Sequence, residues 1–442
     1  MRSAMGPVAR SAMRPPARLG AAFHRYWGSD VTVGLTDGML GTAIPLIAAL
    51  LTTDPLAVSG LTAARFLPWL LFGAVSGAVV DRIDRARAMI TANLVRSAVL
   101  ALLAVLIAGG QASIWTLYVV MFTVMTCETV VDTASRAMLP ALVGRSHLDR
   151  ANGRLEGGRV AAEDFAGAPM AGLLFAVAAV LPVASAAGTY ALAALLLVAI
   201  PVTARRPRRP GGPAGGDPAG GGPVGGGSGG SIGRDVVEGF RYVFGVPIMR
   251  RMVLLHTGTM MGLQMGAAVL VLFVVERLGV PPALYGAFMV SSAVGALLGS
   301  AVAARAAARF GRARVLRTSL VVMAALAFGL ALAPGPLTGA LVWGLLGTAL
   351  AVMNVLFAGV LQVIVPDELR GRASGVRRMV GWGLSPLGAL AGGMLGRIDL
   401  ALPFAVSGLV FALTVAVCWR TIGAAVRLVG DRPGMGHAEP PA

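Results

Sequence analysis

The stretch from Gly77 to Arg87 reads Gly-Ala-Val-Val-Asp-Arg-Ile-Asp-Arg-Ala-Arg and interrupts two long apolar runs. It is too short to be a domain. We interpret it as a tight turn between two membrane helices, with charges arranged to hold a neighbouring segment in place. A degraded copy, Ala-Arg-Phe-Gly-Arg-Ala-Arg, occupies residues 308–314, about 227 residues further on. The repeat predicts a chain built from two related halves.

The composition indicates a polytopic membrane protein. The 442-residue chain is 56% hydrophobic and only 13% charged, which is too apolar for a soluble protein of this length. Apolar runs of roughly 20 residues recur along it, each long enough to cross about 30 Å of hydrocarbon. We therefore predict an all-α integral membrane protein with twelve transmembrane helices, arranged as two pseudo-symmetric six-helix bundles.

The net charge of +17 suggests a nucleic-acid partner, but its distribution argues against one. Arginines cluster on every second connection between apolar runs, which is the positive-inside pattern of a protein in a lipid bilayer. The chain has no Lys, and therefore no P-loop lysine or Schiff-base chemistry. Cys127 and Cys418 lie far apart and form no disulfide framework or zinc spacing. We expect no enzyme, no cofactor and no metal.

The apolar runs and the composition shifts divide the chain into six parts. The predicted spans are 30–51, 56–80, 88–108, 114–138, 160–180 and 183–204 in the first half, and 252–276, 283–304, 315–333, 339–363, 373–395 and 402–420 in the second. The predicted parts are a basic cytoplasmic tail (1–28), an N-terminal bundle (29–204), a disordered Gly/Pro-rich linker (205–233), an interfacial amphipathic helix (234–249), a C-terminal bundle (250–421) and a cytoplasmic tail (422–442). An even number of spans places both termini in the cytoplasm.

Two further matches support the internal repeat. Pro140 ends the fourth predicted span and Pro366 the tenth, about 226 residues apart. Pro169 in the fifth span corresponds to Pro386 in the eleventh, and both lie among glycines. We predict that Pro169, Gly172 and Pro386 belong to positions where helices pack closely.

The chain resembles the major facilitator superfamily in three features. They are the six plus six helices, the central linker and the motif Gly77-x3-Asp81-Arg82-x2-Arg85-x-Arg87. The stretches 63–68 (Ala-Ala-Arg-Phe-Leu-Pro) and 138–143 (Met-Leu-Pro-Ala-Leu-Val) are similar to the branch that holds macrolide and siderophore (enterobactin) exporters. The chain departs from the family pattern at several places. In the turn, Asp84 replaces a glycine, and in its second copy Ala308 replaces the aspartate. In the fifth span, residues 168–173 read Ala-Pro-Met-Ala-Gly-Leu instead of Gly-Pro-x-x-Gly-Gly, and the fourth span has no arginine in its core.

The resemblance implies transport by alternating access, with a substrate site near the bilayer midplane. We expect a secondary active exporter of a small amphipathic molecule (a drug, natural product or siderophore), coupled to protons as an antiporter. The resemblance further implies a monomer in the plasma membrane. An uptake or facilitated-diffusion carrier, a non-transporting scaffold or sensor, and a lipid-handling protein remain as alternatives.

The turn motif is expected to act as a cytoplasmic latch. Asp81 can meet the start of the eleventh span together with Arg377 or Arg378, where helix dipole and cation both favour an anion. Gly77 permits close helix approach. The remaining basic residues of the proposed latch are Arg82, Arg85 and Arg87, for which a purely topogenic role is the alternative.

Ionisable residues inside apolar spans are costly and are candidates for function. Asp37 is the best candidate for proton coupling; pairing with an arginine near the inner boundary is the alternative. Glu128 and Asp132 lie four residues apart on one helix face and are expected to titrate as a coupled pair. Asp132 has the alternative of pairing with Arg136.

Three polar residues of the second half are candidates for substrate contact or coupling. His256 is a candidate because histidine as a residue type titrates in a useful range, and packing or interfacial anchoring is the alternative role. Gln264 and Asn354 have the capacity to hydrogen-bond substrate, or equally to join helices. Glu163 and Asp164 near Arg159 are expected to form a structural salt-bridge network.

Overall fold

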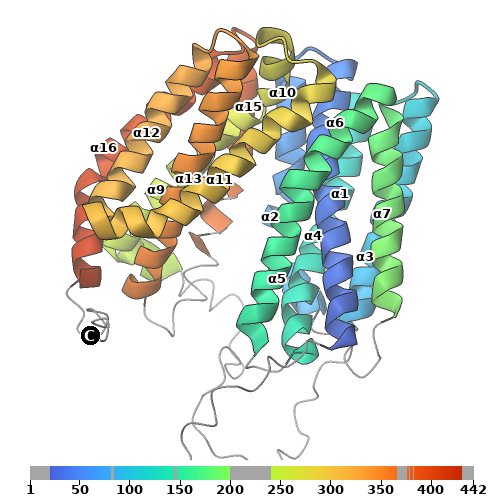
Figure 1. Cartoon of the computed structure of the whole chain (residues 1–442), viewed down its shortest axis with the longest axis horizontal. Helices are drawn as coiled ribbons and strands as arrows, with labels where there is room; N and C mark the ends of the chain where they lie inside the picture. The colour runs from blue at the N-terminus through green and yellow to red at the C-terminus, as the bar shows by residue number, and fades with distance from the viewer. Residues whose placement is uncertain are drawn as a thin grey trace, which may run out of the picture.

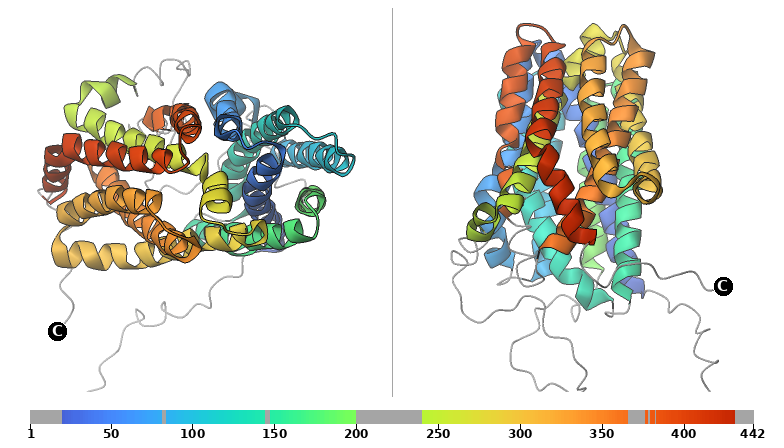
Figure 2. Two further views of the ribbon diagram at one scale, coloured as in Figure 1. Left: turned by 90° about the horizontal axis from the view of Figure 1, so that it is seen from above. Right: turned by 90° about the vertical axis from the view of Figure 1, so that its left-hand side faces the viewer.

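The computed structural model shows two helical bundles side by side (Figures 1 and 2). It describes residues 20–80, 84–143, 147–199, 240–365, 376–377, 379–381 and 383–430. Every regular element within these ranges is helical. The fold is therefore the predicted all-α membrane architecture.

The N-terminal bundle reproduces the predicted order of spans. Its helices are α1 (Ala21–Leu51), α2 (Pro55–Val80), α3 (Arg85–Ala108), α4 (Ile114–Leu142), α5 (Leu148–Val160), η3 (Ala161–Gly167), α6 (Ala168–Val177) and α7 (Val180–Val198). The helix α1 begins nine residues before its predicted span. The side chain of Asp84 accepts a hydrogen bond from the Arg87 N–H (3.0 Å) and caps α3, so the residue that departs from the family turn has a structural role here.

The predicted span 160–180 belongs to a longer run of three joined helices that begins twelve residues earlier, at Leu148. The α5 helix continues through a π-helical segment, η3, into α6. Pro169 lacks the N–H that would bond the carbonyl of Phe165, which favours a widened turn immediately before it. The π-helical turn carries Glu163 and Asp164.

The C-terminal bundle contains the helices of the second half. They are α9 (Pro247–Ala267), α10 (Leu270–Leu272), η5 (Phe273–Arg277), α11 (Pro282–Phe310), α12 (Arg312–Ala331), α13 (Pro336–Ile364), α15 (Ser385–Gly396) and α16 (Leu402–Gly430). The predicted span 252–276 is bent by 45° between α9 and the α10–η5 segment. The α16 helix extends ten residues beyond its predicted end.

Within the described ranges, the number of helices able to cross a bilayer is consistent with the predicted spans. Ten described helices are long and apolar enough to cross a bilayer, or eleven if the bent pair counts as one span. The predicted span 373–395 lies partly outside the described residues. Its described part contains all but the last residue of the 12-residue helix α15. The predicted linker and the first six residues of the predicted amphipathic helix (234–239) also lie outside these ranges. Residues 240–245 are helical, and Val243 packs with Val253 and Val365 of the second half.

The two bundles meet along two helix pairs, α6 with α11 and α2 with α15 (Figure 1). Between α6 and α11, a Cβ added to Gly172 would lie 2.6 Å from the Ala283 carbonyl oxygen, so this glycine permits close backbone approach. Pro169 lies in the same contact, against Gly286. Pro386 occupies the first turn of α15, which packs against α2 and α9.

The bundles are also joined by an ion pair at the end of the molecule opposite to the start of α1 and the end of α16, which is the predicted outer end (Figure 1). Arg397 follows α15 and donates two hydrogen bonds to Asp54 in the α1–α2 connection, at 2.7 and 2.6 Å. This bidentate contact joins residues 343 positions apart in the sequence. The Arg397 guanidinium holds the pKa of Asp54 below its ordinary value.

Candidate functional site

Two connected cavities lie between the bundles. The first, about 650 Å³, is lined by residues from α1, α2, α4, α5 and α9 together with Arg377. The second, about 400 Å³, adjoins it toward the predicted outer end. Asp37, Trp69, Glu128 and Arg159 line both, so the two cavities form one continuous space, which we term the central cavity.

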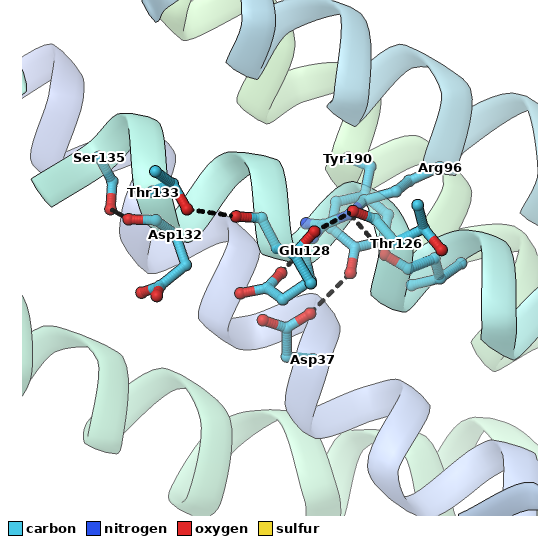
Figure 3. A network of polar contacts seen from close by, with 10 residues as sticks. Asp37, Arg96, Thr126, Glu128, Asp132, Thr133, Ser135 and Tyr190 are labelled. Atoms are coloured by element: carbon cyan, nitrogen blue, oxygen red, sulfur yellow. Dashed lines mark hydrogen bonds and ion pairs between the residues drawn. The ribbon is translucent and has the colours of Figure 1, made fainter. Parts of the chain in front are cut away.

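A network of polar side chains forms one wall of the central cavity (Figure 3). Arg96 of α3 is 0% exposed and donates from Nη2 to the carboxylate of Glu128 on α4. Its Nε donates to the Val124 carbonyl oxygen at 3.2 Å, and its guanidinium lies 5.1 Å from the centre of the Tyr190 ring. The Tyr190 hydroxyl on α7 donates to Asp37 Oδ1 on α1 at 2.6 Å. Four helices therefore converge on two carboxylates.

The two carboxylates differ in how their charge is compensated. Glu128 has a full counter-charge in Arg96, and its side chain is 25% exposed toward the cavity. Asp37 receives a hydrogen bond from a neutral phenol, and the ion pairs found among the described residues do not include it. A charge in a low-dielectric site is costly without a partner. Asp37 is therefore the group in this network best suited to exchange a proton.

The structure brings most predicted coupling residues to the central cavity. Asp132 lies one turn of α4 from Glu128 and lines the first cavity. Gln264 of α9 lines the second cavity. His256 lines the first, is 6% exposed and stacks on Phe357 with ring centres 5.6 Å apart. Asn354 is exposed on α13 and lines neither part of the central cavity.

The predicted latch is only partly described. Asp81, Arg82 and Arg378 lie outside the described residues, and so does the side-chain environment of Gly77, which falls within α2. Arg85 and Arg87 open α3. Arg377 lines the first cavity, and its Nη1 lies 3.4 Å from His256 Nε2. The latch therefore remains a prediction.

The predicted salt-bridge network around Arg159 is confirmed for one of its two acids. The guanidinium of Arg159 bonds Glu163 at 3.0 Å and also Glu156 at 3.2 Å. Within the described residues, no ion pair joins Arg159 to Asp164.

Sequence reasoning missed Arg96 and Tyr190 as parts of the site. Arg96 lies inside the predicted span 88–108, so the rule that selected Asp37 applies to it equally. Tyr190 offers no comparable signal because a tyrosine in an apolar span is unremarkable in composition. Only the fold places its hydroxyl against Asp37.

Comparison with solved structures places the fold among transporters. A bacterial homologue of the iron transporter ferroportin, solved in an inward-facing state, matches with a TM-score of 0.71 at 14% identity and covers 92% of this chain and 100% of that one. The nucleoside transporter NupG matches with a TM-score of 0.65 at 14% identity, covering 92% of this chain and 99% of that one. At such identities the likeness shows the fold alone.

Sequence comparison finds two kinds of relative. Macrolide efflux protein A of Streptococcus pyogenes is 28% identical over 132 residues, which are 30% of this chain and 32% of that protein. The chain thus matches about a third of the length of that relative. An uncharacterized MFS-type transporter of Bacillus subtilis, YfiS, is 25% identical over 394 residues, covering 86% of this chain and 88% of that protein.

The strongest sequence evidence is the match to a family profile. The profile of the Major Facilitator Superfamily aligns with residues 27–382 and, in a second alignment, with residues 252–434. These alignments include the helices that line the central cavity, and the helical architecture agrees with them. The chain is therefore a multi-pass membrane protein that belongs to the Major Facilitator Superfamily.

Proposed function

We propose that this protein is a proton-coupled exporter of a small amphipathic molecule, with Asp37 as the residue that carries the proton. The observation that carries the proposal is the unequal compensation of Asp37 and Glu128, which share one cavity wall. Export is favoured by the partial similarity to a macrolide efflux protein. The proposal includes the plasma membrane as location, cytoplasmic termini and a monomeric transporter.

The proposed cycle uses the two openings of an alternating-access carrier. When the central cavity opens outward, Asp37 takes up a proton from the outer medium. When it opens inward, substrate enters from the cytoplasm and the proton leaves. Substrate and proton bias opposite states of the same equilibrium, which couples the two fluxes. Glu128 stays paired with Arg96, and this pair maintains the polarity of the wall.

The proposal is tested by transport into inverted membrane vesicles with an imposed pH gradient and a panel of fluorescent lipophilic compounds. We expect the gradient to drive accumulation by the wild type. Asp37→Asn should reduce gradient-driven accumulation at least about tenfold while retaining substrate binding, because the amide exchanges no proton. Glu276→Gln serves as the control, since it removes an exposed carboxylate remote from the cavity.

Two results would contradict the proposal. One is transport by the wild type that is equally fast with and without a gradient, which would favour facilitated diffusion. The other is gradient-driven accumulation that survives in Asp37→Asn, which would place the proton on another residue.

A further inference from the structure

The central cavity has a charge opposite to that of the whole protein. Among the described residues, six acidic side chains line it, against three arginines. The acidic residues are Asp30, Asp37, Glu128, Asp132, Glu156 and Glu163, and the arginines are Arg65, Arg159 and Arg377. In a protein of net charge +17, the described lining of the cavity thus carries a formal net charge of −3, or −2 when the buried Arg96 behind the wall is included.

The acidic excess is concentrated on one wall. Asp30 and Asp37 lie seven residues apart on α1 and therefore share a helix face. Glu128 faces the same space from α4. Arg159 is engaged by two carboxylates of its own helix, Glu156 and Glu163. The α1 face is thus the most negative part of the cavity, and it extends from the predicted cytoplasmic mouth to mid-depth.

The second portion of the cavity, toward the predicted outer end, carries several large apolar side chains beside its charged ones. Leu40, Ile44, Phe66, Trp69, Met121 and Met125 line this portion beyond Asp37. Aromatic faces attract organic cations as well as apolar groups, and methionines adapt to irregular shapes. Each of the two portions has a volume within the range that small-molecule sites occupy.

The arrangement of these carboxylates suits an organic cation rather than a bare metal ion. A metal site needs several ligands converging on one point. No group of three or more His, Cys, Asp or Glu side chains in the described part of the chain is close enough to hold a metal. The acidic residues are instead distributed along the cavity, next to apolar surface.

We propose that the central cavity selects amphipathic organic cations. The positive group of the substrate lies along the α1 face between Asp30 and Asp37, and its apolar body contacts Phe66 and Trp69. This inference rests on the proposed transport function, because it names the substrate class of the same site. The negative field draws a cation in from the cytoplasmic mouth, and the apolar side chains of the second portion retain it.

Binding of three matched probes to the purified protein tests this inference. The probes are tetraphenylphosphonium, tetraphenylborate and triphenylphosphine oxide, which share phenyl groups but carry a positive, a negative and no charge. Binding is measured by equilibrium dialysis in neutral detergent at pH 7.5, against a blank of detergent alone. We expect the cation to bind at least about tenfold more tightly than either other probe.

Variants of α1 connect the selectivity to the proposed wall. Asp30→Asn should weaken binding of tetraphenylphosphonium about fivefold or more and leave the neutral probe unchanged, because only a Coulombic attraction is removed. Asp30→Glu, which keeps the negative charge, should bind tetraphenylphosphonium about as tightly as the wild type. Glu276→Gln changes the net charge equally at an exposed position outside the cavity and should have no effect.

The outcomes separate this inference from the proposed function. Equal binding of all three probes, preferred binding of the anion, binding of none, or an Asp30→Asn variant with unchanged cation affinity would overturn the inference. Selective cation binding without gradient-driven transport would support the inference and contradict proton-coupled export. Gradient-driven transport of neutral compounds only would support proton-coupled export and contradict the inference.

Discussion

At the scale of single residues, the site is governed by one buried cation among acidic and aromatic side chains. Arg96 is fully buried, and its Nη1 has no hydrogen-bond partner among the described residues. It therefore depends on Glu128, Val124 and the Tyr190 ring for the compensation of its charge. A buried ion pair of this kind contributes little net stability, but the loss of one partner is costly.

This dependence predicts a strong coupling between Arg96 and Glu128. Arg96→Met should destabilise the protein by about 1–3 kcal/mol, because a partly buried carboxylate loses its counter-charge. The double variant with Glu128→Gln should recover most of this loss. The measurement is thermal unfolding of the detergent-solubilised protein, for both single variants and the double one. Strictly additive effects would show that the two side chains are not energetically coupled.

The candidate site was predictable from the sequence only to the extent that its residues stand out from their surroundings. Asp37, Glu128 and Asp132 interrupt apolar spans, and each lines the central cavity. Asn354 met the same criterion but is exposed on α13, because polarity within a span does not indicate which helix face carries it. The hydrogen bond between Tyr190 and Asp37 depends on the packing of α7 against α1, which local sequence does not encode.

At the scale of helices, glycines determine how closely the two bundles approach. Gly286 of α11 faces the backbone of Ala168 and Pro169 on α6, where an added Cβ would contact main-chain atoms. Gly188 of α7, in contrast, has nothing within 4 Å of an added Cβ. The matching positions of Pro169 and Pro386 predicted that the two halves of the chain repeat the same order of helices. The role of Gly286 was not, since it is one of 60 glycines in the chain.

The two glycines predict opposite responses to the same substitution. Gly188→Ala should stabilise by up to about 1 kcal/mol, because alanine favours the helix at an exposed site. Gly286→Ala should destabilise by about 1–3 kcal/mol, because the backbones of α6 and α11 would have to move apart. Thermal unfolding of both variants beside the wild type measures the difference. A Gly286→Ala variant as stable as Gly188→Ala would mean that α6 and α11 are not closely packed.

At the scale of the whole molecule, the bundles are held together at the predicted outer end. Asp54 and Arg397 form a bidentate pair across the two halves, close to where α2 packs on α15. The first portion of the central cavity lies toward the other end of the molecule, among residues of the predicted cytoplasmic half of α1 and α4. We infer an inward-facing state, in which the outer pair has to break before the cavity can open outward. The pattern of spans predicted the two bundles, but a contact between residues 343 positions apart arises only from the fold.

The outer pair predicts how the balance between the two states responds to mutation and pH. In a background without Cys127 and Cys418, spin labels at Thr53→Cys and Ile398→Cys report the distance across the outer contact. Asp54→Asn should increase the long-distance population severalfold, because a contact present only in the inward-facing state is removed. The charge exchange Asp54→Arg with Arg397→Asp should restore the short distance. Asp399→Asn is the matched control, since it breaks the Arg277 pair within one bundle.

The pH response follows from the sign of the Asp54 shift. Arg397 lowers the pKa of Asp54, so the pair contributes fully above the ordinary carboxyl value of 3.8 and is lost only as pH falls through the lowered pKa. The wild-type distance distribution across this contact should therefore be the same at pH 7 and pH 5. A response of the protein to protons over that interval would then arise in the central cavity. A short-distance population that disappears between pH 7 and pH 5 in wild type, and also in Asp37→Asn, would show that the outer contact itself senses protons.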